Sequence, residues 1–298
     1  MKDVIRKLKN KISSRKNIDE QKILMGKILS SQYKGKSNVD SLDQVEFSIF
    51  SQFGDDGIIQ YLIHNIHIDN KTFIEFGVGD YYESNTRFLM MNNNWSGLVM
   101  DGSEKNIYLL KTSYYYWKHD LNSKAVFIDE NNINTLISEQ GYEGDIGLLH
   151  IDLDGNDYYI LKAIEVVSPV ILILEYNSVF GKKRPISVPY NPMFIRGNAH
   201  YSNLFWGASL KSLCDLATIK GYSFIGCNSA GNNAYFVRDD KLTKNIQPVS
   251  IEKGFVDSKY RESRDKSGKL SFLNKDKQKK ILRGLDVFNT ETKKIEKF

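Results

Sequence analysis

Between residues 72 and 237 the sequence alternates short apolar runs with helix-like stretches, and this alternation restricts the fold more than any other feature. Continuous apolar strands separated by helices are typical of a parallel sheet that is buried on both faces. The last two apolar runs are joined by a short Gly- and Asn-rich segment, 227–233, which predicts an antiparallel hairpin. The predicted strands are 72–76, 97–100, 125–128, 146–153, 170–174, 223–226 and 234–237.

We therefore expect an α/β, Rossmann-like fold with a seven-stranded, mostly parallel sheet, an antiparallel hairpin at one edge, and helices on both faces. The sheet domain is predicted to span residues 45–245 and to contain a non-periodic insertion on the substrate side, 177–206. A basic helical arm with a linker, 1–44, precedes this domain. A basic segment, 246–298, follows it.

The charge of the chain is unevenly distributed. Residues 1–37 hold 11 Lys and Arg against 3 Asp and Glu, and residues 251–298 hold 14 against 8, whereas the net charge of the whole chain is only +5. Basic arms bind anionic lipid or nucleic acid, or are simply solvated helices. A peripheral contact of the N-terminal arm with the inner face of the membrane and a homodimer both stay open, and we expect no nucleic-acid partner.

The first residues, MKDVIRKLKNKISSRKN, lack the apolar core of a signal peptide, and no apolar stretch is long enough to cross a bilayer. Two cysteines, Cys214 and Cys227, are too few for a disulfide framework. We expect a cytoplasmic protein whose two thiols are buried.

Carboxylates stand at the ends of the first five predicted strands. In an open α/β sheet, ligands bind outside the carboxyl ends of the strands, at the point where the strand order reverses. Acidic residues also cap the helices that follow, but five strand ends in succession favour a ligand site. These carboxylates are Glu75, Asp101, Asp129, Asp152, Asp154 and Glu175.

Two glycines, Gly77 and Gly79, follow the first strand, and glycine lets a ligand approach the backbone closely. The pyrophosphate-binding pattern G-x-G-x-x-G would need a third glycine where Tyr82 stands, so a dinucleotide lacks its usual site. A nucleoside without phosphates remains compatible, because Asp101 at the end of the second strand suits the two ribose hydroxyls.

Two ordered segments resemble the cofactor-binding motifs of class I S-adenosylmethionine-dependent methyltransferases. FIEFGVGD at 73–80 is similar to their motif I, and GLVMDGS at 97–103 is similar to their acidic motif II. SQFGDDG at 51–57 and HIDLDG at 150–155 resemble more narrowly the FkbM-type methyltransferases, which are often found with capsular or lipopolysaccharide biosynthesis. Many members of that group carry Asp-x-Gly-Ala-Asn in motif I, whereas this chain has Glu-Phe-Gly-Val-Gly.

The resemblance implies a methyltransferase that uses S-adenosylmethionine for O-methylation of a sugar or modified group in capsular or surface polysaccharide biosynthesis. Gly77 and Gly79 would pack against the methionine part of the cofactor, Asp101 would hold the ribose, and Asp129 or Glu130 would lie near the adenine. The other cofactor-binding residues that it implies are Gln52, Glu75 and Ser103.

Transfer to an alcohol also needs a group that removes the acceptor's proton. The candidate catalytic residues are His200 in the insertion, and Asp152 and Asp154 after the fourth strand. His150 shares a strand face with Asp152 but lies deeper in the sheet, so we interpret it as a core histidine. Arg196 in the insertion suits a phosphate or carboxylate, so the expected partner is a small-molecule or saccharide acceptor that carries such a group.

Two other functions stay open. DLD at 152–154 also resembles the DxD motif with which glycosyltransferases hold a divalent ion and a sugar nucleotide; with Glu175 it suits Mg²⁺ or Mn²⁺ in a methyltransferase as well. A glycosyltransferase would leave the glycine loop after the first strand unexplained. NPMF at 191–194 resembles a loop of nucleic-acid base methyltransferases, but it follows the fifth strand instead of the fourth.

Overall fold

The computed structural model describes the backbone of residues 2–34, 36 and 39–298. Its main sheet has seven strands in the order β3-β2-β1-β4-β5-β8-β7. Neighbours among the first five strands are parallel, and β8 is antiparallel to both β5 and β7, which confirms the predicted Rossmann-like sheet with its antiparallel hairpin. The strands are β1 Thr72–Phe76, β2 Ser96–Asp101, β3 Leu121–Ala125, β4 Gly144–Ile151, β5 Val167–Glu175, β7 Tyr222–Cys227 and β8 Asn233–Arg238.

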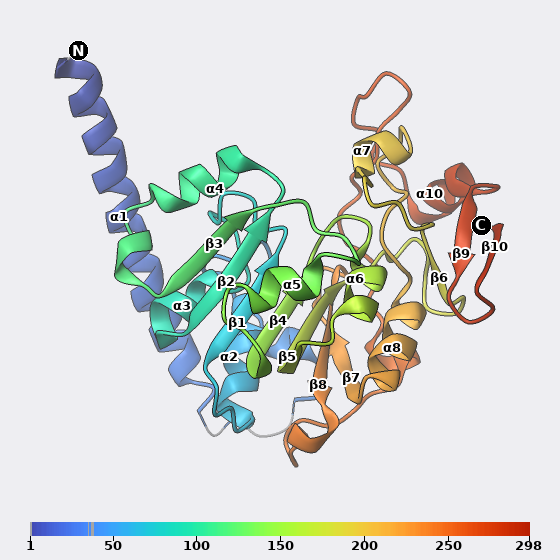
Figure 1. Cartoon of the computed structure of the whole chain (residues 1–298), viewed down its shortest axis with the longest axis horizontal. Helices are drawn as coiled ribbons and strands as arrows, with labels where there is room; N and C mark the ends of the chain where they lie inside the picture. Colours follow the sequence, from blue (N-terminus) through green and yellow to red (C-terminus); the bar gives the residue numbers. More distant parts are fainter. Residues whose placement is uncertain (1, 35, 37–38) are drawn as a thin grey trace.

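Helices cover both faces of this sheet (Figure 1). One face packs against helices α2, α3 and α4, and the other packs against α5, α6 and α8. Ile171 and Ile173 of β5 belong to the first core, while Leu172 and Leu174 belong to the second. Burial on both sides explains why the strands read as continuous apolar runs. The helices are α2 Asp55–Asn65, α3 Arg87–Asn93, α4 Glu104–Lys111, α5 Ile133–Ser138, α6 Asp157–Ala163 and α8 Leu210–Ile219.

The third strand was predicted at 125–128, and this prediction is wrong, because β3 spans Leu121–Ala125. β3 is an edge strand that pairs only with β2, so polar residues such as the exposed Asn122 are tolerated in it. The apolar residues 126–128 lie beyond the end of the strand and line a cleft, where Phe127 is exposed while Val126 and Ile128 also pack on the core.

The N-terminal arm is one continuous helix, α1 Lys2–Ser31, where the sequence indicated two helical runs. Figure 1 shows its first turns projecting beyond the sheet. Its later turns dock on α2 and α3: the carboxylate of Asp19 lies 2.5 Å from Arg87, and the Ser30 hydroxyl donates to Gln60. Arg87 is only 1% exposed, and its guanidinium lies between the rings of Phe50 and Tyr115. Some of the arm's side chains after Arg15, such as Asp19 and Ser30, therefore pack against the sheet domain.

The C-terminal segment packs on the insertion. Strand β6, Ile186–Ser187, pairs with β9, Asp286–Asn289, and β10, Lys294–Lys297, completes a small antiparallel sheet. The cluster beneath it joins Ile186 and Val188 of the insertion to Leu282 and Val287. Three short helices complete these regions: α7 Arg196–Ala199, α9 Ile251–Gly254 and α10 Lys275–Leu282.

Both cysteines are buried and free, as predicted, with Cys214 in α8 and Cys227 at the end of β7. Among the described residues, none of the helices combines the length and the hydrophobicity that crossing a bilayer requires.

Candidate active site

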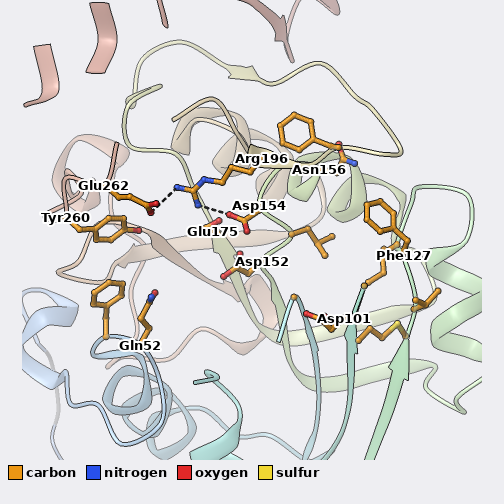
Figure 2. A pocket seen from close by; sticks show the side chains of 18 residues that line it. Gln52, Asp101, Phe127, Asp152, Asp154, Asn156, Glu175, Arg196, Tyr260 and Glu262 are labelled. Carbon is orange, nitrogen blue, oxygen red and sulfur yellow. Dashed lines mark hydrogen bonds and ion pairs between the residues drawn. The ribbon is translucent and has the colours of Figure 1, made fainter. Parts of the chain in front are cut away.

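A cleft of about 630 Å³ opens at the carboxyl ends of the strands. It lies over the junction of β1 and β4. From this junction the chain adds β2 and β3 on one side and β5 on the other. This switch point is where an open α/β sheet binds its ligands. Figure 2 shows Phe127 and Asp101 on one side of the cleft, Gln52 and Tyr260 on the other, and Asp152 between them.

At the end of β2, the carboxylate of Asp101 holds the neighbouring loops in place. Its Oδ2 accepts a hydrogen bond from the backbone N–H of Gly79 at 2.9 Å, and its Oδ1 accepts from the N–H of Ser103 at 2.8 Å and from Asn106 at 3.2 Å. A carboxylate has about four acceptor positions, so Asp101 retains room for one more donor, such as a ligand hydroxyl.

The two glycines after β1 have different surroundings. Gly77 has φ +74°, and a Cβ there would lie 1.7 Å from the carbonyl oxygen of Asp152, so the close approach is between two loops of the protein. Gly79 has φ +54°, and a Cβ there would meet nothing within 4 Å. Gly77 thus excludes a side chain while its backbone still lines the cleft, and Gly79 has open space around it.

An apolar shelf stands beside Asp101. Phe127 is 44% exposed and shares the wall of the cleft with Val126 and Ile128. Leu153 extends the same surface, and the fully buried Met100 lies beneath it. The sequence did not identify this shelf as a binding surface, because 125–128 had been assigned to a buried strand.

Two predicted cofactor residues hold turns and do not line the cleft. The Ser103 hydroxyl caps α4 by accepting from the N–H of Asn106. The Asp129 carboxylate accepts from the N–H groups of Asn131 and Asn132 at the start of α5. The first is an ordinary helix cap, and the second is a side-chain turn that precedes the helix.

A buried network surrounds Glu75 at the end of β1. Its carboxylate accepts hydrogen bonds from Ser84, from the backbone of Asn85 and from Thr86, and it lies 3.0 Å from Nδ1 of His150. Burial acts to raise the pKa of Glu75, but the hydrogen bond and charge of His150 outweigh it, so the pKa is lowered. His150 is buried, as the core interpretation predicted.

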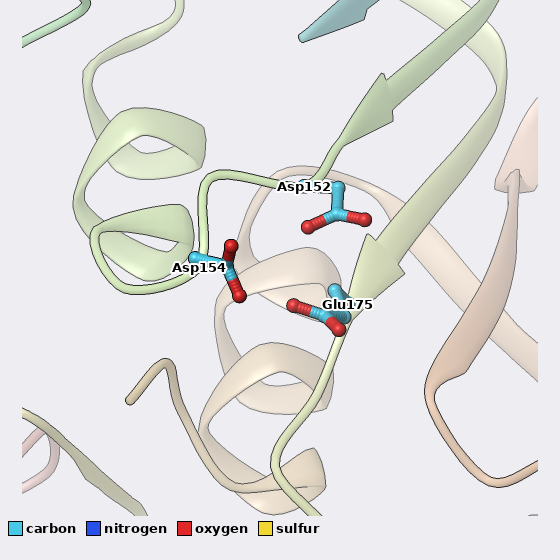
Figure 3. Close-up of side chains that lie close together, drawn as sticks. All are labelled: Asp152, Asp154 and Glu175. Carbon is cyan, nitrogen blue, oxygen red and sulfur yellow. The ribbon is translucent and has the colours of Figure 1, made fainter. Parts of the chain in front are cut away.

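Three carboxylates meet at the ends of β4 and β5 (Figure 3). One oxygen from each of Asp152, Asp154 and Glu175 lies within 4.8 Å of the other two. Glu175 is only 6% exposed, and its buried Oε2 has no hydrogen-bond partner among the described residues. Burial raises the pKa of Asp152 to about 6, and burial followed by repulsion from Asp152 and Asp154 raises that of Glu175 well above its usual value.

The insertion and the C-terminal segment form the opposite wall. Arg196 donates to Asp154 at 2.7 Å, lies 3.9 Å from Glu262 and sits over the ring of Trp206. Tyr260 stacks parallel on Phe53, with ring centroids 5.4 Å apart. Arg196 was predicted to bind an acceptor, whereas Tyr260 and Glu262 lie far along the chain and no sequence motif pointed to them.

His200, the predicted base in the insertion, does not line this cleft. Its Nδ1 forms a 2.7 Å hydrogen bond with the Ser202 hydroxyl, and its ring packs on Tyr201. Gln52, in contrast, lines both the cleft and an adjoining cavity.

Comparison with known proteins gives a distant structural likeness. The O-methyltransferase from Bacillus cereus in complex with S-adenosylhomocysteine has a TM-score of 0.39 and 13% identity, covering 74% of this chain and 91% of that one. TehB from Haemophilus influenzae has a TM-score of 0.38 and 11% identity, covering 62% of each chain. The N-terminal domain of EvdMO1 with S-adenosylhomocysteine bound has a TM-score of 0.36 and 13% identity, covering 56% and 72%. No protein-family model and no curated protein matches the sequence significantly. At these scores, a function has to be argued from the residues of the cleft.

Proposed function

We propose that this protein transfers a methyl group from S-adenosylmethionine to an oxygen of a hydroxylated acceptor. The observation that carries the proposal is the pairing, at the switch point, of a carboxylate at the end of β2 with an open apolar shelf. A nucleoside needs these two features: an acceptor for its ribose hydroxyls and a flat apolar surface for its base.

The cofactor-side half of the cleft fits the nucleoside end. Asp101 has one unused acceptor position after its three bonds to the protein, and Phe127 offers an exposed ring within the same wall. Asp101 is also fixed to Gly79, so the ribose site and the glycine loop are positioned together. The Ser103 hydroxyl caps α4 and the Asp129 carboxylate holds the turn before α5, so both serve the fold beside this site.

The acceptor-side half is polar and acidic. Asp152, Glu175 and Glu262 line it together with the Tyr260 hydroxyl, a set of acceptors suited to the several hydroxyls of a sugar. Arg196 is already paired with Asp154, so it balances that carboxylate. A surface-polysaccharide precursor as acceptor, and FkbM-type kinship, rest on the sequence motifs and belong to this proposal.

When bound, the sulfonium supplies a methyl carbon whose bond to sulfur breaks, with the electron pair left on sulfur, as a bond to the acceptor oxygen forms. The walls of the cleft align the acceptor for this in-line displacement. We assign removal of the acceptor's proton to Asp152, which lines both the cleft and the adjoining cavity. His200 is left out because it does not line the cleft.

The same carboxylates suit a divalent cation. Mg²⁺ and Mn²⁺ prefer carboxylate oxygens, and Asp152, Asp154 and Glu175 present three of them at one point, one beside a buried oxygen without a partner. A cation there would lower the pKa of a coordinated hydroxyl. Calorimetric titration with MnCl₂ tests this: Glu175→Gln is expected to abolish the binding, whereas Glu262→Gln, a carboxylate of the same cleft outside the cluster, is expected to retain it.

Calorimetric titration with S-adenosylhomocysteine tests the proposed function. We expect wild-type protein to bind, and Phe127→Ala to weaken binding about tenfold, as for loss of one base-stacking ring. Trp117→Ala is the matched control, because Trp117 is 78% exposed and lies outside the cleft. Absence of binding by the wild type, together with binding of a sugar nucleotide in the presence of Mn²⁺, would replace this proposal with a glycosyltransferase.

A further inference from the structure

A second cavity of about 420 Å³ adjoins the cleft beside Gly77. The two cavities share Gln52, Phe53, Gly77 and Asp152 in their walls, so one elongated ligand can occupy both. The wall of the second cavity also includes a residue of the N-terminal helix, Arg15. The sequence had placed that helix outside the domain.

The charges of the second cavity are suited to a zwitterion. Arg15 is the one Lys or Arg among its lining residues, and no acidic group of the described chain pairs with it. Asp80 and Glu83 are exposed carboxylates in the same wall. Asp55, a further lining carboxylate, is already used by the protein, since one of its oxygens accepts from two asparagines and a tyrosine.

Arg15 is exposed, but the helix that carries it and the residue that its guanidinium contacts are held by buried groups. Its guanidinium lies over the ring of Tyr82, 5.3 Å from the centroid. The Tyr82 carbonyl accepts a hydrogen bond from Arg87 at 2.9 Å, and Arg87 also binds Asp19, one turn after Arg15 on the same face of α1. The buried Arg87 therefore fixes both the helix that carries Arg15 and the ring beneath it.

We propose that Arg15 binds the α-carboxylate of the amino-acid end of S-adenosylmethionine, and that Asp80 and Glu83 face its α-amino group. This inference rests on the proposed function: with the nucleoside against Phe127 and Asp101, the remainder of the cofactor passes Gly77 into the second cavity. Helix α1 is then part of the cofactor site, and Asp19 and Arg87 are positioning residues.

Comparing two ligands distinguishes binding of the α-carboxylate by Arg15 from a general effect of Arg15 on the fold. S-adenosylhomocysteine carries the amino-acid end, whereas 5′-methylthioadenosine has the same nucleoside and lacks it. We expect Arg15→Gln to weaken S-adenosylhomocysteine about tenfold or more, as for loss of a charge-assisted hydrogen bond, and to leave methylthioadenosine within about twofold. Arg15→Lys should recover part of the loss. Lys16→Gln, the adjacent exposed cation, should change neither affinity.

Unchanged affinity of Arg15→Gln for S-adenosylhomocysteine would overturn the inference, and so would an equal loss for both ligands, because Arg15 would then act through the fold. If wild-type protein bound methylthioadenosine and S-adenosylhomocysteine equally well, the amino-acid end would lie outside the second cavity, which also overturns it. Absence of wild-type binding to either ligand would instead reject the proposed function itself.

Discussion

The carboxylates at the ends of β1 and β2 occupy positions equivalent to those at the ends of β4 and β5. The two sets differ in how many hydrogen bonds they accept from the protein. Glu75 and Asp101 accept hydrogen bonds from side chains and backbone N–H groups that shape the loops around them. At the other end, Asp152, Asp154 and Glu175 face one another, and the buried Oε2 of Glu175 has no hydrogen-bond partner among the described residues. A carboxylate at a strand end is therefore available to a ligand only where the protein leaves an acceptor position unused, as it leaves one at Asp101 and more in the β4–β5 cluster.

The same substitution at the two buried glutamates gives the largest expected difference. Glu75→Gln places an amide nitrogen among hydrogen-bond donors and removes the partner of His150, so we expect a loss of about 3–5 kcal/mol in unfolding free energy. Glu175→Gln removes a buried charge beside two other carboxylates, so we expect stability to change by less than about 1 kcal/mol, or to increase. Urea denaturation in the presence of EDTA, followed by circular dichroism, measures both. Equal losses would contradict the comparison.

Gly77 and Gly79 test the contact between the loop after β1 and the loop after β4, where the two regions meet. Gly77→Ala brings a methyl group against the Asp152 carbonyl and strains a positive φ, so we expect a loss of about 2–4 kcal/mol. Gly79→Ala carries only the positive-φ cost, about 1 kcal/mol, since nothing lies within 4 Å of its Cβ. Thermal unfolding measures the difference. If both variants lose the same stability, the contact between the β1 and β4 loops does not set the requirement at Gly77.

Arg196 provides a test confined to the β4–β5 end. Arg196→Met keeps an apolar stem over Trp206 but removes the positive charge beside Asp154. We expect a stability loss of about 1 kcal/mol or less, because the Asp154 side chain is 58% exposed. We also expect the affinity for Mn²⁺ to rise about three- to tenfold, since a competing cation is lost. Calorimetry gives the affinity, and a fall in Mn²⁺ affinity would show that Arg196 supports the site instead of competing with it.

The sequence could predict the sheet and the position of the acidic cluster, because both depend on local patterns. The apolar run of β5, followed by Glu175, places that carboxylate at the cleft without any knowledge of tertiary contacts. Strand β3 could not be located this way, since an edge strand needs no apolar run and the apolar residues after it line the cleft and pack on the core outside any strand. Arg15 and Tyr260 come from segments far away in the chain, which only the docking of α1 and of the C-terminal segment brings to the site.

The position of a polar residue after a strand also does not tell a helix cap from a ligand-binding residue. Ser103 tests that distinction with the smallest expected effect. Its hydroxyl caps α4 and lies outside the cleft, although the motif resemblance implied a cofactor contact. We expect Ser103→Ala to lower the unfolding free energy by about 0.5–1 kcal/mol through loss of the cap, and to leave the affinity for S-adenosylhomocysteine within about twofold. Ser250→Ala, which removes the hydroxyl cap of α9 outside the cleft, controls for a general loss of helix stability. A selective loss of cofactor affinity in Ser103→Ala would show that this cap also sets the position of Asp101. At the end of β2, a residue that holds the fold could then not be separated from a residue that serves the ligand site.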